Sequence, residues 1–205
     1  MSGSSKRMDK AFLVGLTGII GGGKSTAAKI LESIGAFRIS SDEIARKYSD
    51  PDSPIRDELV RELGEEILSE SGKPDRKKIA KVVFEDPKKL EALNRLIHPR
   101  VRAEFQSVLE GLTENTLVIW EVPLLFETDA FEICDKTVCV LSDPESSLKR
   151  VVSRDGISLK EATARMNSQL PIEEKAKRAD YVIRNLGTLR ELEQECKRIF
   201  KQLRG

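Results

Sequence analysis

The chain has little of what marks several large protein classes. Its three cysteines, Cys134, Cys139 and Cys196, form neither a CxxC pair nor an even set, which argues against a zinc ribbon and a disulfide framework. No apolar run is long enough to span a bilayer, and the polar stretch 1–10 lacks the apolar centre of a signal peptide. We therefore predict reduced thiols, a flexible tail at 1–10, a cytoplasmic location and no membrane partner.

The net charge of the chain is also close to zero. The 205 residues carry 35 Lys or Arg against 34 Asp or Glu, so the chain has no field of one sign that would draw it onto nucleic acid. We expect no nucleic-acid partner, and an anionic ligand must be met by local groups. The length allows one sizeable core with a modest inserted subdomain, in a monomer or a weak homo-oligomer.

Short apolar runs alternate with segments of helical periodicity along most of the chain. The runs that predict strands are 11–17, 37–39, 117–120, 137–141 and 181–183. Alternating strands and helices indicate a five-stranded parallel sheet with helices on both faces, an α/β fold in three layers. Ser40 with Glu43, and Thr188 with Glu191, have the spacing of capping boxes that open two of the helices.

Two helical segments interrupt this alternation. The stretch 42–112 has helical spacing throughout and is expected to form a helical insertion that binds an acceptor. The polar stretch 154–177 is expected to form a helical lid. The nucleotide-binding core then consists of the remaining segments, which are 11–41, 113–153 and 178–205.

The segment from Gly18 to Ser25 matches GxxxxGK(S/T) between a predicted strand and a predicted helix, the context that a P-loop requires. Backbone N–H groups of the glycine loop converge on phosphate oxygens, and the following helix directs the positive end of its dipole at the same charge. Lys24 is expected to reach the β and γ phosphates, and the Ser25 hydroxyl to bind Mg²⁺. The predicted nucleotide-binding residues here are Gly18, Gly21, Gly22, Gly23, Lys24, Ser25 and Thr26. The alternative is a glycine-rich turn with an incidental Lys-Ser pair.

A nucleotide-gated switch of the GTPase type is a rival to a kinase, but it needs DxxG and NKxD segments, and the chain contains neither. A kinase needs an acceptor-binding insertion and a lid that carries arginine, and both are predicted. Arg150 and Arg154 are four residues apart and Arg165 lies farther along, so lid closure can bring guanidinium groups to the transferred phosphoryl. The alternative for each arginine is a solvated basic helix face.

Six short motifs of the sequence together resemble motifs of the dephospho-CoA kinase family. They are GLTGIIGGGKST, SSDEIAR, IHP, EVPLLFE, RDG and KRADYVIRNLG. The likeness runs from Phe12 to the C-terminal helix, and the order of the motifs is its strongest part. The resemblance implies a P-loop fold that uses ATP and Mg²⁺ to phosphorylate the ribose 3′-hydroxyl of dephospho-CoA, the final step of CoA synthesis. The alternative is another small-metabolite or nucleoside kinase on the same scaffold.

The resemblance also implies roles for residues that begin the insertion. Asp42 matches the second aspartate of the family's DAD word and is expected to accept the hydroxyl proton, while Ser40 replaces the first aspartate. Arg46 is expected to contact a phosphate of the acceptor. Asp42 has the alternative of an acid favoured by a helix dipole, and Arg46 that of an ion pair with Asp42.

Further positions follow from the same likeness. Glu121, at the end of the third strand, is expected to hold Mg²⁺ through water, and His98 to hydrogen-bond the acceptor, although a lone His before Pro is often a helix boundary. Asn185 and Gly187 resemble the loop that approaches the ATP adenine. The acceptor's adenine or pantetheine is expected to contact the segment Pro123, Leu124, Leu125 and Phe126. Core packing is the alternative for Leu124 and Leu125.

Overall fold

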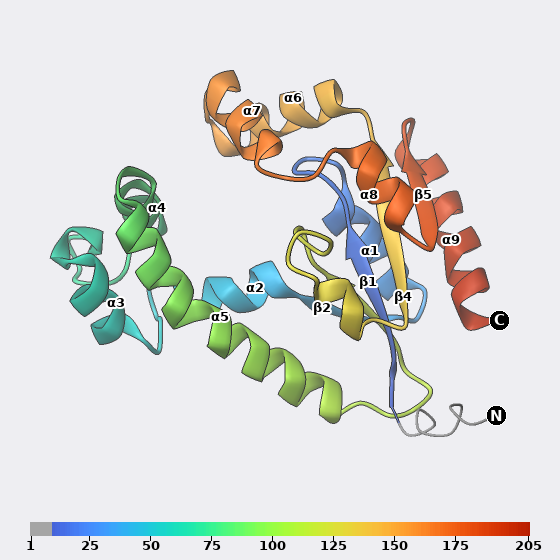
Figure 1. Ribbon diagram of the computed structural model, residues 1–205, viewed down its shortest axis with the longest axis horizontal. Coiled ribbons are helices and arrows are strands. Elements are labelled where there is room, and N and C mark those ends of the chain that lie inside the picture. Colours follow the sequence, from blue (N-terminus) through green and yellow to red (C-terminus); the bar gives the residue numbers. More distant parts are fainter. Residues whose placement is uncertain (1–9) are drawn as a thin grey trace. The chain divides into compact units, whose positions relative to one another are not determined.

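The computed structural model describes residues 10–205, which form two compact units. The core unit comprises the chain up to Ile39 together with Leu112–Gly205, and the helical unit comprises Ser40–Gly111. All of the predicted tail except Lys10 lies outside the described residues. Figure 1 shows both units along the chain.

The core unit contains a five-stranded sheet. Its strands are β1 (Phe12–Thr17), β2 (Phe37–Ser40), β3 (Leu117–Glu121), β4 (Lys136–Ser142) and β5 (Tyr181–Asn185). They lie in the order β2-β3-β1-β4-β5, and β1 pairs in parallel with both β3 and β4. The prediction of an α/β fold with a five-stranded parallel sheet is confirmed. Because parallel strands end at one edge of the sheet, this order brings the ends of β1 and β3 together.

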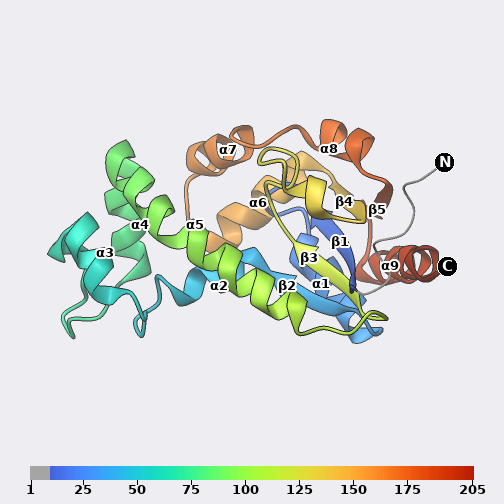
Figure 2. The ribbon, with the colours of Figure 1, turned by 60° about the horizontal axis from the view of Figure 1, so that its bottom comes forward.

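Helices cover both faces of this sheet, as Figure 2 shows. In the core unit they are α1 (Lys24–Ser33), η2 (Ala130–Ile133), α6 (Pro144–Asp155), α7 (Leu159–Asn167), α8 (Ile172–Arg178) and α9 (Leu189–Arg204). Successive residues of β4 point to opposite faces. Val138 and Val140 therefore pack into the cluster that contains residues of α1 and α9, while Cys139 packs against Ile172 of α8.

Side chains cap the first turns of three helices of the core unit. The Asp143, Ser158 and Thr188 side chains each accept a hydrogen bond from a backbone N–H in the first turn of α6, α7 and α9. At the end of α1, Gly35 has a positive φ of 110°, and Ala36 N–H bonds back to Leu31 O at 3.1 Å. A glycine with a positive φ just beyond the last turn is a common way for an α-helix to end.

The helical unit consists of α2 (Ser41–Lys47), α3 (Arg56–Leu63), η1 (Glu65–Ile67), α4 (Arg76–Glu85) and α5 (Pro87–Glu110). Leu59, Leu63 and Ile67 are fully buried in its core. Helix α5 continues through Pro99, so His98 lies inside a helix, and the helix-boundary interpretation is wrong. Across residues 10–205, every helix is too short or too polar to cross a lipid bilayer.

Candidate active site

The loop between β1 and α1 has a backbone that requires glycine. Gly21 and Gly23 have φ values of 71° and 88°, which side chains other than glycine rarely adopt. A Cβ added at Gly21 would lie 2.3 Å from Ser147 O, and one at Gly23 would lie 2.2 Å from Asn185 Nδ2. The N-cap residue of α1 is Gly23, which has no side chain to accept from the first turn. The N-terminal N–H groups of α1 are therefore available to an anion, as the P-loop interpretation requires.

Glu121 is the centre of a charged cluster beside this loop. It ends β3, opposite Leu16 of β1, and it is only 2% exposed. Lys24 Nζ lies 3.3 Å from Glu121 Oε1, and the Ser25 hydroxyl donates to the same oxygen. The two residues predicted to hold Mg²⁺, Ser25 and Glu121, are thus in direct contact, with the predicted phosphate-binding lysine next to them.

Arg38 of β2 completes this cluster, and the sequence analysis did not single it out. Its Nη1 lies 3.4 Å from Glu121 Oε2, and its Nε lies 3.4 Å from Glu32 Oε2 on α1. A signal was present, because a single cation interrupts the short run Phe37–Ser40 in a strand predicted to pack in a sheet. A charge at such a position needs a partner.

Two predicted nucleotide-binding side chains, one on α6 and one at the end of β5, donate hydrogen bonds to carbonyls of the glycine loop. Arg150 on α6 donates to Gly21 O at 2.6 Å, and Asn185 at the end of β5 donates to Gly22 O at 3.0 Å. Gly187 follows in the turn between β5 and α9, and Thr26 is exposed in the first turn of α1. The fold therefore gathers the ends of β1, β3 and β5 around one loop.

Arg154 and Arg165, the two arginines of the predicted lid, contact acids of their own helices. Arg154 donates to Asp155 from Nε at 2.6 Å and from Nη2 at 2.9 Å, and this hydrogen bonding to a carboxylate raises the pKa of Arg154. Arg165 Nη2 lies 2.7 Å from Glu161 Oε1, one turn earlier on α7. Of the three arginines predicted to serve the nucleotide, Arg150, which precedes the predicted lid, is the one that the structure brings to the P-loop.

A buried ion pair holds α8 against the segment that follows β3. Lys175 is 0% exposed, and its Nζ lies 2.8 Å from Glu127 Oε1 and 2.6 Å from Pro123 O. Glu127 Oε1 also accepts from Leu170 N at 2.9 Å, and Gln169 Oε1 accepts from Ile20 N in the glycine loop at 3.0 Å. The sequence analysis missed these contacts, which fix the C-terminal part of the predicted lid.

The segment after β3 divides into buried and exposed residues. Leu125 is 0% exposed and Phe126 is 5% exposed, with the Phe126 ring 5.5 Å from that of Phe131. Core packing, the alternative weighed for Leu125, accounts for its position. Leu124 is 39% exposed, and Pro123 uses its carbonyl to bind Lys175 and the Thr17 hydroxyl.

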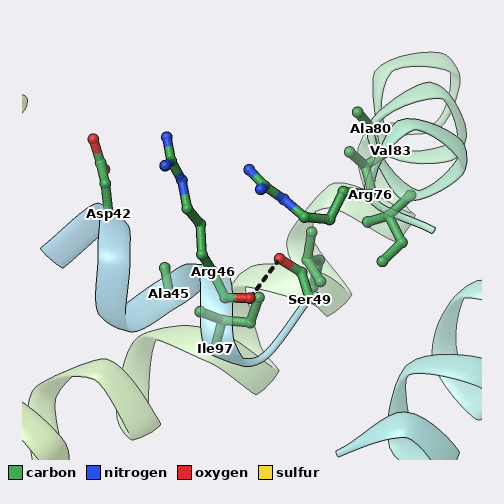
Figure 3. A pocket seen from close by; sticks show the side chains of 10 residues that line it. Asp42, Ala45, Arg46, Ser49, Arg76, Ala80, Val83 and Ile97 are labelled. Carbon is green, nitrogen blue, oxygen red and sulfur yellow. Dashed lines mark hydrogen bonds between the residues drawn. The ribbon is translucent and has the colours of Figure 1, made fainter. Parts of the chain in front are cut away.

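The helical unit contains a pocket of its own, with a volume of about 340 Å³. Figure 3 shows Asp42, Arg46 and Arg76 extending from α2 and α4 on the same side of the pocket. Its apolar lining consists of Ala45, Ile79, Ala80, Val83, Leu93 and Ile97. Charged side-chain ends beside an apolar pocket lining suit a ligand that has both an anionic and an apolar part.

Local contacts explain why α2 presents Asp42 and Arg46 to this pocket. The helix begins at Ser40, whose hydroxyl accepts from Glu43 N at 3.3 Å, and Ser40 itself is buried. At the other end, Lys47 pairs with Glu104 of α5, and Tyr48 donates to Glu104 Oε2 at 3.1 Å. With both ends held, residues four apart project from one face of α2.

Arg46 and Arg76 are the cations at this pocket. Within the described part of the chain no ion pair joins Arg46 to Asp42, so the pairing alternative for Arg46 does not account for its position. Arg76 has Asp50 as a partner, with Nε and Oδ1 3.6 Å apart. Sequence reasoning missed Arg76, because nothing local distinguishes it from other cations that begin a helix. His98 is exposed on α5 and does not line the pocket.

The residues around the glycine loop suit Mg²⁺ better than a transition metal. Residues 10–205 contain no group of three His, Cys, Asp or Glu side chains arranged to hold a metal. Mg²⁺ keeps several waters and needs only one or two protein oxygens besides the nucleotide phosphates. The Ser25 hydroxyl and the Glu121 carboxylate, which touch one another, supply such oxygens.

The thiols of the core unit take no part in this chemistry. Burial raises the pKa of both Cys139 and Cys196 to about 12. Burial, with the neighbouring Asp135 carboxylate, raises the pKa of Cys134 to about 12 as well. All three thiols therefore stay protonated at neutral pH and are poor nucleophiles.

Comparisons with known proteins agree with this geometry. The family described as CoaE: Dephospho-CoA kinase matches residues 12–191. A dephospho-CoA kinase of Leptospira interrogans is 57% identical over 196 residues, which are 96% of this chain and 95% of that protein. A crystal structure from Thermus thermophilus superposes with a TM-score of 0.80 at 37% identity and covers 96% of this chain and 100% of its own. For a dephospho-CoA kinase structure from Campylobacter jejuni, the TM-score is 0.66 at 34% identity, with 93% and 96% covered.

Proposed function

Because the chain belongs to the dephospho-CoA kinase family, we propose that it transfers the γ-phosphoryl group of ATP to the ribose 3′-hydroxyl of dephospho-CoA, with CoA and ADP as products. One observation in the structure carries this proposal. Lys24 and Ser25 of the glycine loop both contact Glu121 at the end of the neighbouring strand. This is the arrangement of groups that binds a nucleotide's phosphates with Mg²⁺.

On the nucleotide side, the loop N–H groups and the N-terminus of α1 bind the phosphates, and Lys24 neutralises charge on the β and γ groups. Ser25 and Glu121 are the residues that would hold Mg²⁺, which would neutralise further phosphate charge. Arg150 and Asn185 hold the glycine loop, and Asn185 and Gly187 lie at the adenine of ATP. Arg154 and Arg165 are assigned to the transferred phosphoryl group. To bind it, Arg154 must break its ion pair with Asp155, and Arg165 its ion pair with Glu161.

On the acceptor side, Asp42 hydrogen-bonds the ribose hydroxyl and takes its proton as the bond to phosphorus forms. Arg46 and Arg76 bind the anionic part of the acceptor, and the apolar lining of the pocket receives an uncharged part. Leu124 is the exposed residue of the segment after β3 that offers apolar contact, while His98 is assigned only a hydrogen bond. Electrostatic complementarity and positioning, rather than covalent chemistry, give the rate enhancement.

Other acceptors define the alternative, because the core fold by itself does not select an acceptor. A kinase for another small metabolite or a nucleoside would use the same loop. The family match over most of the chain does not favour this alternative.

An acceptor panel tests the proposal directly. Purified protein with ATP and Mg²⁺ is given dephospho-CoA, adenosine, other nucleosides or shikimate in separate reactions, and ADP and the phosphorylated product are both measured. We expect CoA from dephospho-CoA and only background ADP from the other acceptors. Turnover of a nucleoside with none of dephospho-CoA would overturn the assignment.

Location and assembly complete the proposal. We place the reaction in the cytoplasm, where ATP is abundant, with the protein as a monomer or a weak homo-oligomer. Light scattering over a concentration series measures the mass in solution, and a stable mass several times 23.0 kDa would contradict the assembly part.

A further inference from the structure

Glu121 has two cations, one on each carboxylate oxygen. Lys24 Nζ is 3.3 Å from Oε1, and Arg38 Nη1 is 3.4 Å from Oε2. The side chains of Lys24 and Arg38 are only 11% and 12% exposed, and that of Glu121 is 2% exposed. Coulomb interactions at such a site are screened far less than at the surface.

The two cations differ in what else they do. In the proposed function Lys24 binds the β and γ phosphates. One ammonium group cannot fully neutralise these phosphates and Glu121 at the same time. When a nucleotide binds, Glu121 therefore loses part of its interaction with Lys24. A buried carboxylate left without a cation is strongly unfavourable.

Arg38 is placed to remain with Glu121 throughout. It lies on β2, which neighbours β3 in the sheet, so the backbones that carry Arg38 and Glu121 are joined by strand pairing. Its Nε also faces Glu32 of α1 at 3.4 Å, which gives the guanidinium a second acidic neighbour. A planar guanidinium that bridges two carboxylates is held in one orientation more firmly than an ammonium group.

From this geometry we propose that Arg38 is a positioning residue. It neutralises the charge of Glu121 and holds its carboxylate by Oε2, so that Lys24 can move to the nucleotide while Oε1 stays directed at the Ser25 hydroxyl, where Mg²⁺ would be held. The inference rests on the proposed function for the roles of Lys24 and Mg²⁺. It concerns Arg38 alone, a residue that does not belong to the glycine-loop motif.

The proposal predicts a dependence on Mg²⁺ that a merely structural arginine does not produce. Without Arg38, nucleotide binding in the absence of Mg²⁺ weakens the contact of Glu121 with Lys24, its one remaining cation of the two, so affinity falls. With Mg²⁺ present, the metal supplies positive charge next to Glu121 and restores much of the binding. The ratio of the Kd without Mg²⁺ to the Kd with Mg²⁺ therefore rises when Arg38 is replaced.

The experiment is calorimetric titration of the whole protein with ADP, once with EDTA and once with Mg²⁺. ADP avoids turnover and still carries the β phosphate. For Arg38→Met we expect the Kd ratio to rise by roughly tenfold over that of the unmodified protein. Arg38→Lys retains a cation, and its ratio should change by no more than about threefold.

Two further variants separate positioning from folding. In Glu121→Gln there is no carboxylate to stabilise, so adding Arg38→Met should leave the Kd ratio unchanged. Lys136→Met removes a cation that pairs with Asp180 at 3.0 Å, at the start of β4, and should leave it unchanged as well. The unfolding temperature of each variant without ligand identifies any loss of the folded protein.

The outcomes distinguish the possible failures. An unchanged Kd ratio in Arg38→Met would reject the inference. If ADP affinity falls equally with and without Mg²⁺, Arg38 has a structural role; if affinity does not fall in either condition, Arg38 has no role in ADP binding. If the unmodified protein bound no ADP under either condition, the proposed function itself would fail before Arg38 was tested.

Discussion

The two units use charge in opposite ways. In the core unit the buried charged groups have partners: Glu121 contacts Lys24 and Arg38, and Lys175 contacts Glu127. In the helical unit Asp42 and Arg46 border an apolar pocket with no ion pair between them. Charges that already have partners fix a conformation, whereas Arg46, which does not pair with Asp42 at the pocket, is available to a ligand.

This difference implies that substitutions in the core unit affect folding or nucleotide binding, while those at the pocket affect the acceptor. Lys175 and Lys24 test the first half of the comparison. Asp42 and the pair Arg46 and Arg76 test the second half.

The largest effect is expected from Lys175→Met. The change keeps the length of the side chain but leaves Glu127, which is only 16% exposed, without its cation, and breaking a largely buried pair in this way costs about 3–5 kcal/mol. Urea denaturation measures the free energy of unfolding. Lys136→Met, which removes a half-exposed partner of Asp180, should cost less than about 1 kcal/mol. Equal losses in the two variants would show that burial does not distinguish these pairs.

Lys24→Ala should lower kcat by a factor on the order of 10²–10³, because a cation that stabilises charge on the transferred group is lost. Lys29 lies on the exposed face of the same helix, and Lys29→Ala is the control. Steady-state assays with saturating dephospho-CoA measure both variants. Turnover near that of the unmodified protein in Lys24→Ala would remove the loop from the mechanism.

Asp42→Asn should lower kcat on the order of 10²-fold, because the amide cannot accept the hydroxyl proton. The Kd for ADP should not change, since the residue is assigned to the acceptor. Asp57→Asn, in the first turn of α3, removes an exposed acid of the same unit and serves as the control. Near-normal turnover in Asp42→Asn leaves the helix-dipole interpretation as the better one.

The smallest effect is expected from Arg46→Ala and Arg76→Ala. Each removes one charge-assisted contact to the acceptor, so the KM for dephospho-CoA should rise about tenfold with little change in ADP binding. Arg95→Ala is the control, because Arg95 is 62% exposed on α5 and pairs with Glu91 and Glu62. A rise in the Kd for ADP without a change in KM would contradict the division between the units.

The sequence predicted what depends on local chemistry. Strand 117–120 was recognised as an apolar run, and Glu121 as the acid that closes it, because both follow from neighbouring residues. The caps at Ser40 and Thr188 depend on a spacing of three residues, and both form. The glycine loop required only that its motif follow a strand and precede a helix.

What the sequence could not predict depends on contacts between distant segments. Arg38 meets Glu121 only because β2 and β3 are neighbours in the sheet, and this order is not written in either strand. Lys175 was read as part of a polar lid, yet it is fully buried because its partners are Glu127 and the Pro123 carbonyl. Arg76 became a candidate only when α2, α4 and α5 were seen to enclose one pocket.

The hydrogen bonds from Arg150 and Asn185 to the carbonyls of Gly21 and Gly22 have a kinetic consequence. They hold the glycine loop in its curved form as part of the folded protein, so little ordering is left for the moment of encounter. Nucleotide capture can then proceed at the pace of diffusion and orientation, without waiting for a rearrangement of the loop. The affinity of this site for a nucleotide is then determined mainly by how fast the phosphates leave the loop.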